Sequence, residues 1–169
     1  DHHEKVKKLP KASAIVHNEK LCASGLAYFV AQQLGAKPDL ELAAIATITD
    51  LMELKGINRS IVKFGLVELN HTSRPGLRAL LEIANIKTVG PYEVGYMIGP
   101  RLNASGRIEN ALTALRLLCT KKQSQARELA NLLNETNRSR QTLLEDQTRF
   151  ALSQPSPTEK IIVLEHESY

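Results

Sequence analysis

One stretch decides the fold of this chain: Leu40-Glu41-Leu42-Ala43-Ala44-Ile45-Ala46-Thr47-Ile48-Thr49-Asp50. Pro38 and Asp39 precede it and are typical of a helix start. A helix that is apolar on nearly every side is buried, so the stretch predicts a helix deep in the core. Asp50 is a lone carboxylate at the end of this apolar run. It either caps the next turn or binds a cation.

The segments on both sides of this stretch are mainly amphipathic. The spacing of their apolar residues predicts helices over 21–34, 58–69, 77–84, 110–119 and 124–153, and a short helix or turn over 91–98. Two short apolar runs, Ala12–Val16 and Lys160–Leu164, predict strands. The expected fold class is therefore α/β and mostly helical. Gly25 lies inside a predicted helix at a cost of about 1 kcal/mol, which predicts a packing or ligand reason for it.

Composition narrows the class of protein. A chain of 169 residues with 43% hydrophobic content and no Trp predicts one domain, or one domain with part of a second, around an aliphatic core. The net charge of +4 fits a polyanionic partner without requiring one. Cys22 and Cys119 are isolated, so we expect no disulfide framework and a cytoplasmic location. No apolar stretch reaches the ~18 residues of a membrane span.

The first three residues, Asp1-His2-His3, are the densest cluster of groups that can bind a metal. Such a cluster is either a disordered tail or part of a site. Only a short basic stretch separates it from the predicted strand Ala12–Val16, which favours a site. Adjacent side chains on extended backbone point to opposite sides, so we expect the two imidazoles to face different ways.

The segment from Gly99 to Arg107 contains two glycines, a proline and two arginines. It predicts a loop that binds an anion through Arg101 and Arg107; the alternative is a surface turn with solvated arginines. Tyr92 and Tyr96 precede it and either stack on bases or belong to the core. The long predicted helix carries four arginines that form either a basic rail or a solvated face: Arg127, Arg138, Arg140 and Arg149.

Taken in this order, the motifs resemble the DHH phosphoesterase superfamily, and within it the RecJ-type single-stranded-DNA-specific 5′→3′ exonucleases. The segments that carry the resemblance are Asp1-His2-His3, Leu21–Phe29, Ala46–Leu54, Asn58-Arg59, Ile98–Ile108 and Leu164–Glu167. The resemblance implies that residues 1–120 are the C-terminal part of a DHH catalytic domain with a parallel sheet. It also implies a long connecting helix over 121–155 and the start of a DHHA1-type nucleic-acid-binding domain over 158–169.

The resemblance also implies roles for individual residues. His2 and Asp50 would bind Mn²⁺ or Mg²⁺ in a two-metal site, Asp1 would orient His2, and His3 would contact phosphate or donate a proton. The DNA phosphate would be held by Arg101 and Arg107, with further contacts from Asn103, Ser105 and Arg59. The implied activity is hydrolysis of single-stranded DNA to 5′-mononucleotides in repair and recombination. The expected partners are a single-strand-binding protein and a helicase, and no interaction with a membrane is expected.

This family has two acidic motifs upstream of its signature, and they are absent from this sequence. We therefore expect a central fragment that is inactive alone. Two other functions stay open. One is a non-catalytic nucleic-acid-binding module of the same fold, which would bind DNA without metal affinity. The other is a phosphodiesterase for short oligonucleotides or cyclic dinucleotides, against which the segment Gly99 to Arg107 argues.

Overall fold

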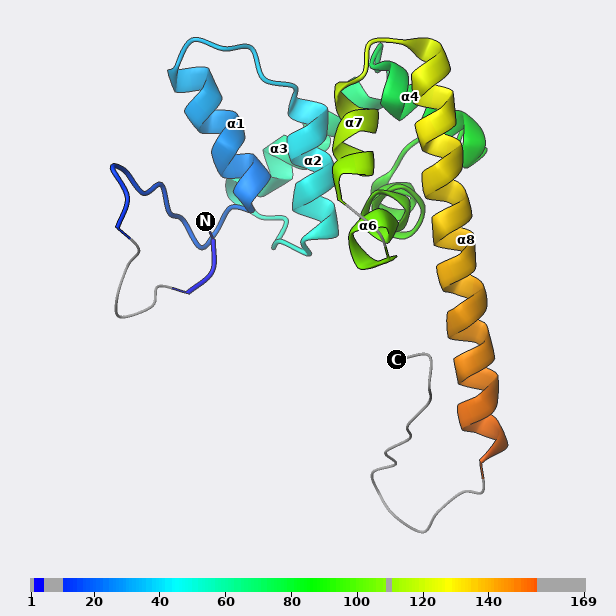
Figure 1. The fold of residues 1–169 in the computed structure, drawn as a ribbon. Coiled ribbons are helices and arrows are strands. Elements are labelled where there is room, and N and C mark those ends of the chain that lie inside the picture. Colours follow the sequence, from blue (N-terminus) through cyan, green and yellow to red (C-terminus); the bar gives the residue numbers. More distant parts are fainter. Residues whose placement is uncertain (1, 5–10, 109–110, 155–169) are drawn as a thin grey trace.

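The computed structural model describes residues 2–4, 11–108 and 111–154, except for the side chains of 105, 107 and 108. Its regular elements in these ranges are helices (Figure 1). They are α1 (Ala23–Gln33), α2 (Leu40–Thr49), α3 (Gly56–Asn70), α4 (Pro75–Ile83), α5 (Pro91–Glu93), the π-helix η1 (Val94–Ile98), α6 (Gly99–Ile108), α7 (Leu112–Cys119) and α8 (Gln123–Ser153). The predicted helices are thus confirmed to within a few residues at each end.

The predicted strand Ala12–Val16 is wrong, because this segment is an irregular loop. A short apolar run becomes a strand only beside another strand, and the described ranges contain none. Ile15 and Val16 consequently lie exposed. The second predicted strand, Lys160–Leu164, lies outside the described residues. The mostly helical part of the expected α/β class is confirmed, whereas no parallel sheet is present in the described ranges.

Helix α2 lies between two apolar clusters, as its sequence predicts. Ala43 and Ala44 pack with Leu26 of α1 and Ile61 of α3. Ile45 belongs instead to the larger cluster, whose further members come from α3, α4, η1, α7 and α8. The buried members of both clusters are aliphatic. Helix α2 is therefore held from several sides, and its two ends are fixed relative to the rest of the domain.

The packing of α3 against α2 depends on Gly65. A Cβ atom at this position would lie 2.4 Å from the Cβ of Ala44 and 2.8 Å from the carbonyl oxygen of Leu40. Neither atom can move without moving α2. The absence of a side chain at Gly65 is therefore what allows the two backbones to approach so closely.

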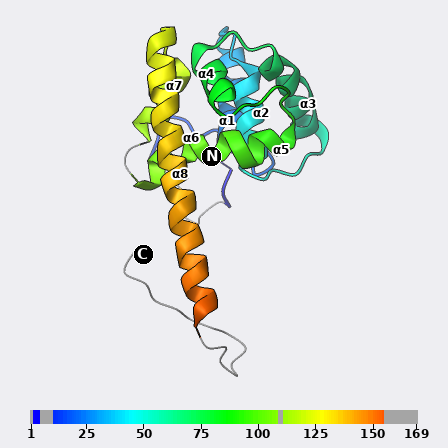
Figure 2. The same ribbon diagram turned by 90° about the vertical axis from the view of Figure 1, so that its right-hand side faces the viewer.

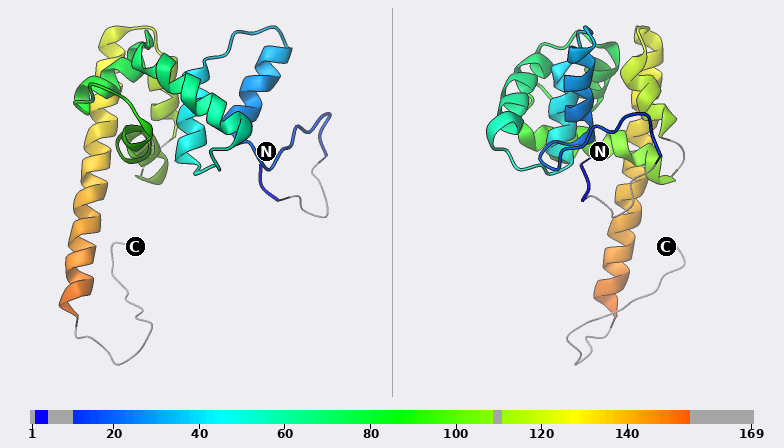
Figure 3. Two further views of the ribbon diagram at one scale, coloured as in Figure 1. Left: turned by 180° about the vertical axis from the view of Figure 1, so that it is seen from behind. Right: turned by 90° about the vertical axis from the view of Figure 1, so that its left-hand side faces the viewer.

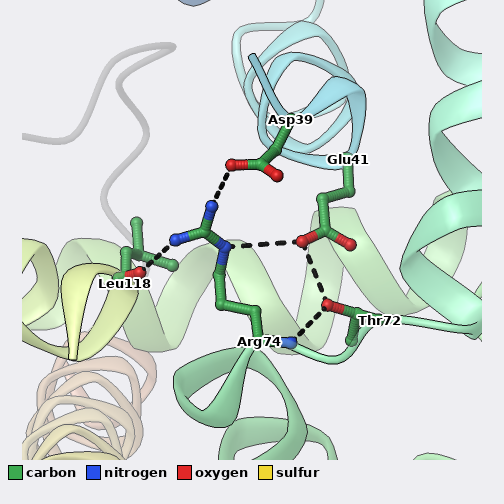
Figure 4. A network of polar contacts seen from close by, with 5 residues as sticks. All are labelled: Asp39, Glu41, Thr72, Arg74 and Leu118. Carbon is green, nitrogen blue, oxygen red and sulfur yellow. Dashed lines mark hydrogen bonds and ion pairs between the residues drawn. The ribbon is translucent and has the colours of Figure 1, made fainter. Parts of the chain in front are cut away.

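The start of α2 is held by a polar network around Arg74 (Figure 4). The guanidinium pairs with Asp39 and with Glu41, and it donates to the carbonyl oxygen of Leu118 in α7. Thr72 donates to the same Glu41 oxygen at 3.0 Å. Burial raises the pKa of Glu41, although Thr72 and Arg74 act in the opposite direction. The network joins α2, α4 and α7.

Helix α8 is a single helix of 31 residues with two different halves. Its first half packs on α4, α6 and α7 and buries Ala126, Ala130 and Leu133 completely. Beyond residue 140 nearly every residue is exposed, and the helix runs past the helical body (Figures 2 and 3). The first half therefore belongs to the core. None of the described helices is long and apolar enough to cross a membrane.

Candidate functional site

The end of α2 brings two of the predicted metal ligands together. Nε2 of His2 lies 3.0 Å from Oδ2 of Asp50. The side chains are 20% and 41% exposed, so the pair lies at the surface of the domain but is partly shielded from water. Asp50 is the C-cap residue of α2, and α3 begins only after Lys55. Asp50 therefore does not cap the next helix, and its carboxylate is turned to the imidazole.

The residue after Asp50 adopts an unusual backbone conformation. Leu51 has φ +53°, in the left-handed region that favours glycine, and its side chain is 90% exposed. The N–H groups of Leu51 and Met52 close the helix by donating to the carbonyl oxygens of Ile48 and Thr47. This tight ending stops α2 directly after Asp50, so the carboxylate is presented at the helix end.

An open cavity of about 680 Å³ lies beside this pair. Five elements contribute to its wall: the start of α1, the end of α2, η1, α6 and α8. The polar side chains that line it include His2, Ser24, Thr49, Asp50, Asn103 and Arg140. The cavity thus joins a carboxylate and an imidazole, which suit a cation, with groups that can bind an anion.

The first turn of α1 faces this cavity through Ala23 and Ser24. Free N–H groups at the start of a helix favour negative charge. Cys22 caps the helix, because its sulfur accepts the N–H of Gly25 at 3.4 Å, and it lies 3.5 Å from the hydroxyl of Thr47 in α2. A Cβ at Gly25 would make only ordinary contacts of 3.5 Å or more, so no packing reason for this glycine is found.

The predicted loop from Gly99 to Arg107 is wrong, because this segment is helix α6 and continues directly from η1. Pro100 has no N–H to donate, yet proline is tolerated near a helix start. The wider π-turn before it, in which the N–H of Gly99 donates to the carbonyl of Val94, keeps the chain helical. A Cβ at Gly99 would lie 2.5 Å from Cγ2 of Thr49, so this glycine serves the packing of α6 on α2.

The predicted phosphate-binding residues are placed differently from one another. Arg101 is half-buried, and it donates to Oδ1 of Asn134 at 3.1 Å and to the carbonyl of Met97 at 2.8 Å. Burial, and secondarily the charge of Arg138, lowers its pKa. These contacts fasten α6 to α8, and Arg101 does not line the cavity. Asn103 is exposed and does line it.

The other predicted contacts are spread more widely. Ser105 and Arg107 lie on α6, and their side chains are outside the described part of the structure. Arg59 is exposed on α3 and does not line the cavity. Asp1 lies outside the described residues.

His3 is not directed away from His2, contrary to our expectation. The two rings stack, with centroids 4.5 Å apart and planes at 28°. The backbone here is not a regular strand, so the alternation expected for extended chains does not apply. The carbonyl of His3 accepts a hydrogen bond from Nε2 of His17 at 2.7 Å, in the tautomer that carries the proton there. This contact holds the N-terminal segment beside the following loop.

Sequence reasoning assigned no role to Asn58 and left Arg140 and two tyrosines undecided. Asn58 is buried and donates to the carbonyls of Lys20 and Glu53, which ties the loop before α1 to the loop after α2. Arg140 was only one of four candidate arginines, and it lines the cavity. Tyr92 and Tyr96 are 63% and 71% exposed and stack on each other at 4.9 Å, so the core alternative for them is wrong.

The side chains of His2 and Asp50 have the chemistry that a divalent ion requires. An imidazole nitrogen and a carboxylate oxygen suit Mn²⁺, and carboxylate oxygen also suits Mg²⁺. His2 supplies the imidazole nitrogen and Asp50 the carboxylate oxygen, and these two atoms lie 3.0 Å apart. The described ranges contain no group of three or more His, Cys, Asp or Glu side chains arranged for a metal. The pair therefore fits part of a coordination shell.

The comparisons with known proteins agree with this combination of a helical fold and a partial metal site. No family model matches the chain. The chain is 39% identical to the single-stranded-DNA-specific exonuclease RecJ of Bacillus subtilis, over 90% of its own length and 21% of that protein. It is also 39% identical to RecJ of Thermus thermophilus, over 97% of its own length and 26% of that protein.

Solved structures give the same result. RecJ of Thermus thermophilus in complex with Mn²⁺ matches with a TM-score of 0.80 and 37% identity, over 93% of this chain and 26% of that one. The complex of the same protein with Mg²⁺ matches with a TM-score of 0.69 and 41% identity, over 78% of this chain and 22% of that one. An exonuclease RecJ bound to manganese matches with a TM-score of 0.82 and 38% identity, over 97% of this chain and 46% of that one. The chain is therefore homologous to the RecJ exonucleases over nearly all of its length, and it spans 21% and 26% of the length of the Bacillus and Thermus relatives.

Proposed function

We propose that this chain supplies one side of the active site of a metal-dependent, single-stranded-DNA-specific 5′→3′ exonuclease. The observation that carries the proposal is the His2–Asp50 pair in the wall of the 680 Å³ cavity, in a chain homologous to RecJ. Relatives solved with Mn²⁺ or Mg²⁺ support the assignment of the pair to a divalent ion. A protein that only binds nucleic acid would not need this pair.

His2 and Asp50 would hold the ion, Mn²⁺ or Mg²⁺. Such an ion polarises a phosphoryl oxygen and lowers the pKa of bound water, which is the chemistry needed for phosphodiester hydrolysis. The ring of His3 stacks on that of His2, and we propose that His3 contacts phosphate or donates a proton. Asp1 remains our candidate for orienting His2. The backbone amides at the start of α1 and the amide of Asn103 would face the negatively charged substrate.

Four further residues remain proposed substrate contacts: Arg101, Arg107, Ser105 and Arg59. The structural support for this role differs among them. Arg101 already has two partners, which favours a role in holding α6 on α8. Tyr92 and Tyr96 form an exposed stacked pair next to Gly95 of the cavity wall. Because bases of single-stranded DNA stack on aromatic rings, we propose that this pair receives a base.

The wider organisation is also a proposal. We keep residues 1–120 as part of a DHH catalytic domain, 121–155 as a connecting helix and 158–169 as the start of a DHHA1-type domain. A role in DNA repair and recombination, interaction with a single-strand-binding protein and a helicase, and a cytoplasmic location belong to the same proposal. We expect the chain alone to be inactive, since the metal ligands among its described residues are so few.

Calorimetric titration with Mn²⁺ tests the proposal. We expect the chain to bind Mn²⁺, and Asp50→Asn and His2→Ala each to weaken binding at least about tenfold because each removes a ligand. Asp146→Asn is the matched control: it removes an exposed carboxylate from α8, far along the chain from the pair. Equal Mn²⁺ affinity in the chain and in Asp50→Asn would contradict the metal site.

Incubation with Mn²⁺ and 5′-phosphorylated single-stranded DNA tests the activity of the chain. We expect little release of mononucleotides. Release at the rate of an intact RecJ would show that the present residues complete the site.

A further inference from the structure

Arg140 differs from the other arginines of α8 in its surroundings. Arg138 and Arg149 are exposed and pair with carboxylates of their own helix, Glu135 and Asp146, at 3.3 and 3.5 Å. Arg127 is exposed near the start of the helix. Arg140 is only partly exposed and forms no ion pair with the described residues. Its positive charge is therefore not balanced within the described part of the domain.

The position of Arg140 is set by Asn137, one turn earlier in α8. Asn137 is 1% exposed, and its Oδ1 accepts a hydrogen bond from Nη2 of Arg140 at 3.4 Å. A fully buried amide has little room to move, so it offers the guanidinium an acceptor in a fixed position. The guanidinium is thus held at one end, while its other N–H groups remain available to a ligand.

The same cavity wall contains Arg140 of α8, Asp50 at the end of α2 and His2 of the N-terminal segment. A divalent ion at the pair and a guanidinium nearby would together attract a group with negative charge on several oxygens. A guanidinium binds phosphate oxygens through two parallel N–H groups. A backbone phosphate of DNA matches this requirement, and a neutral ligand would leave the arginine uncompensated.

We propose that Arg140 is a phosphate-binding residue of this site, and that its guanidinium contacts a backbone phosphate of single-stranded DNA in the cavity beside His2 and Asp50. This inference rests on the proposed function and makes it more specific. Helix α8 is then part of the substrate site as well as a connection. Two asparagines of α8 have different roles, because Asn134 accepts from Arg101 in the contact with α6 and Asn137 orients Arg140 toward the cavity.

The test is binding of a short 5′-phosphorylated oligothymidylate, labelled at its 3′ end, measured by fluorescence anisotropy in Mn²⁺ at several salt concentrations. We expect Arg140→Gln to weaken binding about tenfold, as for loss of a hydrogen bond between charged groups. The slope of log affinity against log salt should fall in magnitude by about 0.7, since one phosphate contact to a single strand is lost. Arg140→Lys should recover part of the affinity.

Arg149→Gln is the matched control, because it removes the same charge from the same helix outside the cavity. We expect it to change affinity less than about twofold. If Arg140→Gln binds as Arg149→Gln does while Asp50→Asn binds weakly, the inference is overturned and the proposed function stands. If the unaltered chain does not bind the oligonucleotide, both are overturned.

Oligonucleotides with one neutral methylphosphonate linkage test contact with phosphate directly. We expect one linkage at which the neutral group weakens binding by the unaltered chain but has no effect on Arg140→Gln. The Arg140→Lys variant, which keeps the charge, serves in the same comparison if Arg140→Gln does not fold. Equal losses at every linkage in the chain and in the variants would show that Arg140 does not contact phosphate.

Discussion

The two ends of α2 carry acidic residues in opposite kinds of environment. At the start, Asp39 and Glu41 are bound by Arg74, which also reaches the carbonyl of Leu118 (Figure 4). At the end, Asp50 pairs with His2 at 3.0 Å in the wall of an open cavity. In the first group Glu41 and Arg74 are 8% and 22% exposed and have several partners within the domain, whereas Asp39 lies at the solvent edge at 53%. In the second group Asp50 is 41% exposed, so we expect it to exchange its partner for a ligand.

This difference shows which charges hold the fold and which are available for function. Buried charges need partners in the folded protein, because an unpaired charge away from water is very costly. The Arg74 network therefore joins three helices. An accessible carboxylate costs little when its partner leaves. We therefore expect that binding of a cation by Asp50 would not weaken the domain.

Arg74→Met should give the largest effect, since it leaves Glu41 buried without its cation. We expect the free energy of unfolding to fall by about 3 kcal/mol, measured by urea denaturation. Asp50→Asn, at the other end of the helix, should cost about 1 kcal/mol or less. Arg78→Met is the control, since Arg78 is exposed on the same helix as Arg74. Equal losses for Arg74→Met and Asp50→Asn would remove the distinction between the two ends.

Gly99→Ala, beside the end of α2 that borders the cavity, should have an intermediate effect on the free energy of unfolding. The new Cβ would lie 2.5 Å from Cγ2 of Thr49, so α6 must move away from α2. We expect a loss of about 2 kcal/mol in thermal or urea unfolding, together with weaker Mn²⁺ binding. Gly95→Ala is the matched control in the same wall, because its Cβ would meet Ile48 at an ordinary 3.9 Å. A stable Gly99→Ala variant with unchanged Mn²⁺ affinity would speak against this packing.

Glu41→Gln should give the smallest effect, visible only in the pH dependence of stability. Burial raises the pKa of Glu41, so the folded protein keeps its proton at pH values where the unfolded chain has released it. The free energy of unfolding should therefore fall as the pH rises from the ordinary value of 4.5 through the raised pKa. Glu41→Gln should lack this component in urea unfolding at a series of pH values. A difference from the unaltered chain that does not vary with pH would contradict the shift.

Much of the helical fold could be predicted from local pattern alone. The apolar stretch Leu40–Thr49 predicted a buried helix, and the structure packs it between two clusters. The local sequence pattern gave wrong predictions where contacts with distant segments decide the structure. Ala12–Val16 has the composition of a strand but no neighbouring strand in the described ranges. The segment from Gly99 to Arg107 has the composition of a turn, yet its first glycine serves close helix packing.

In the candidate site, too, some features could be predicted from the sequence and others depend on the tertiary structure. The resemblance implied that His2 and Asp50 share a metal site, and their separation of 3.0 Å is consistent with that prediction. Their roles stay predictions. No feature of the local sequence distinguished Arg140 from Arg138, which is two residues earlier and exposed. Only the packing of α8 on α6 directs one of them into the cavity and the other into solvent.

The sequence by itself determined which segments are helical, which helix is buried and which residue types could bind a divalent ion. These properties follow from apolar periodicity and side-chain chemistry, which act over a few residues. The tertiary structure alone decided that Arg101 donates to Asn134 of α8 while Arg140 lines the cavity. The physical reason is that hydrogen bonding and burial of a charged side chain depend on which distant helix packs against it.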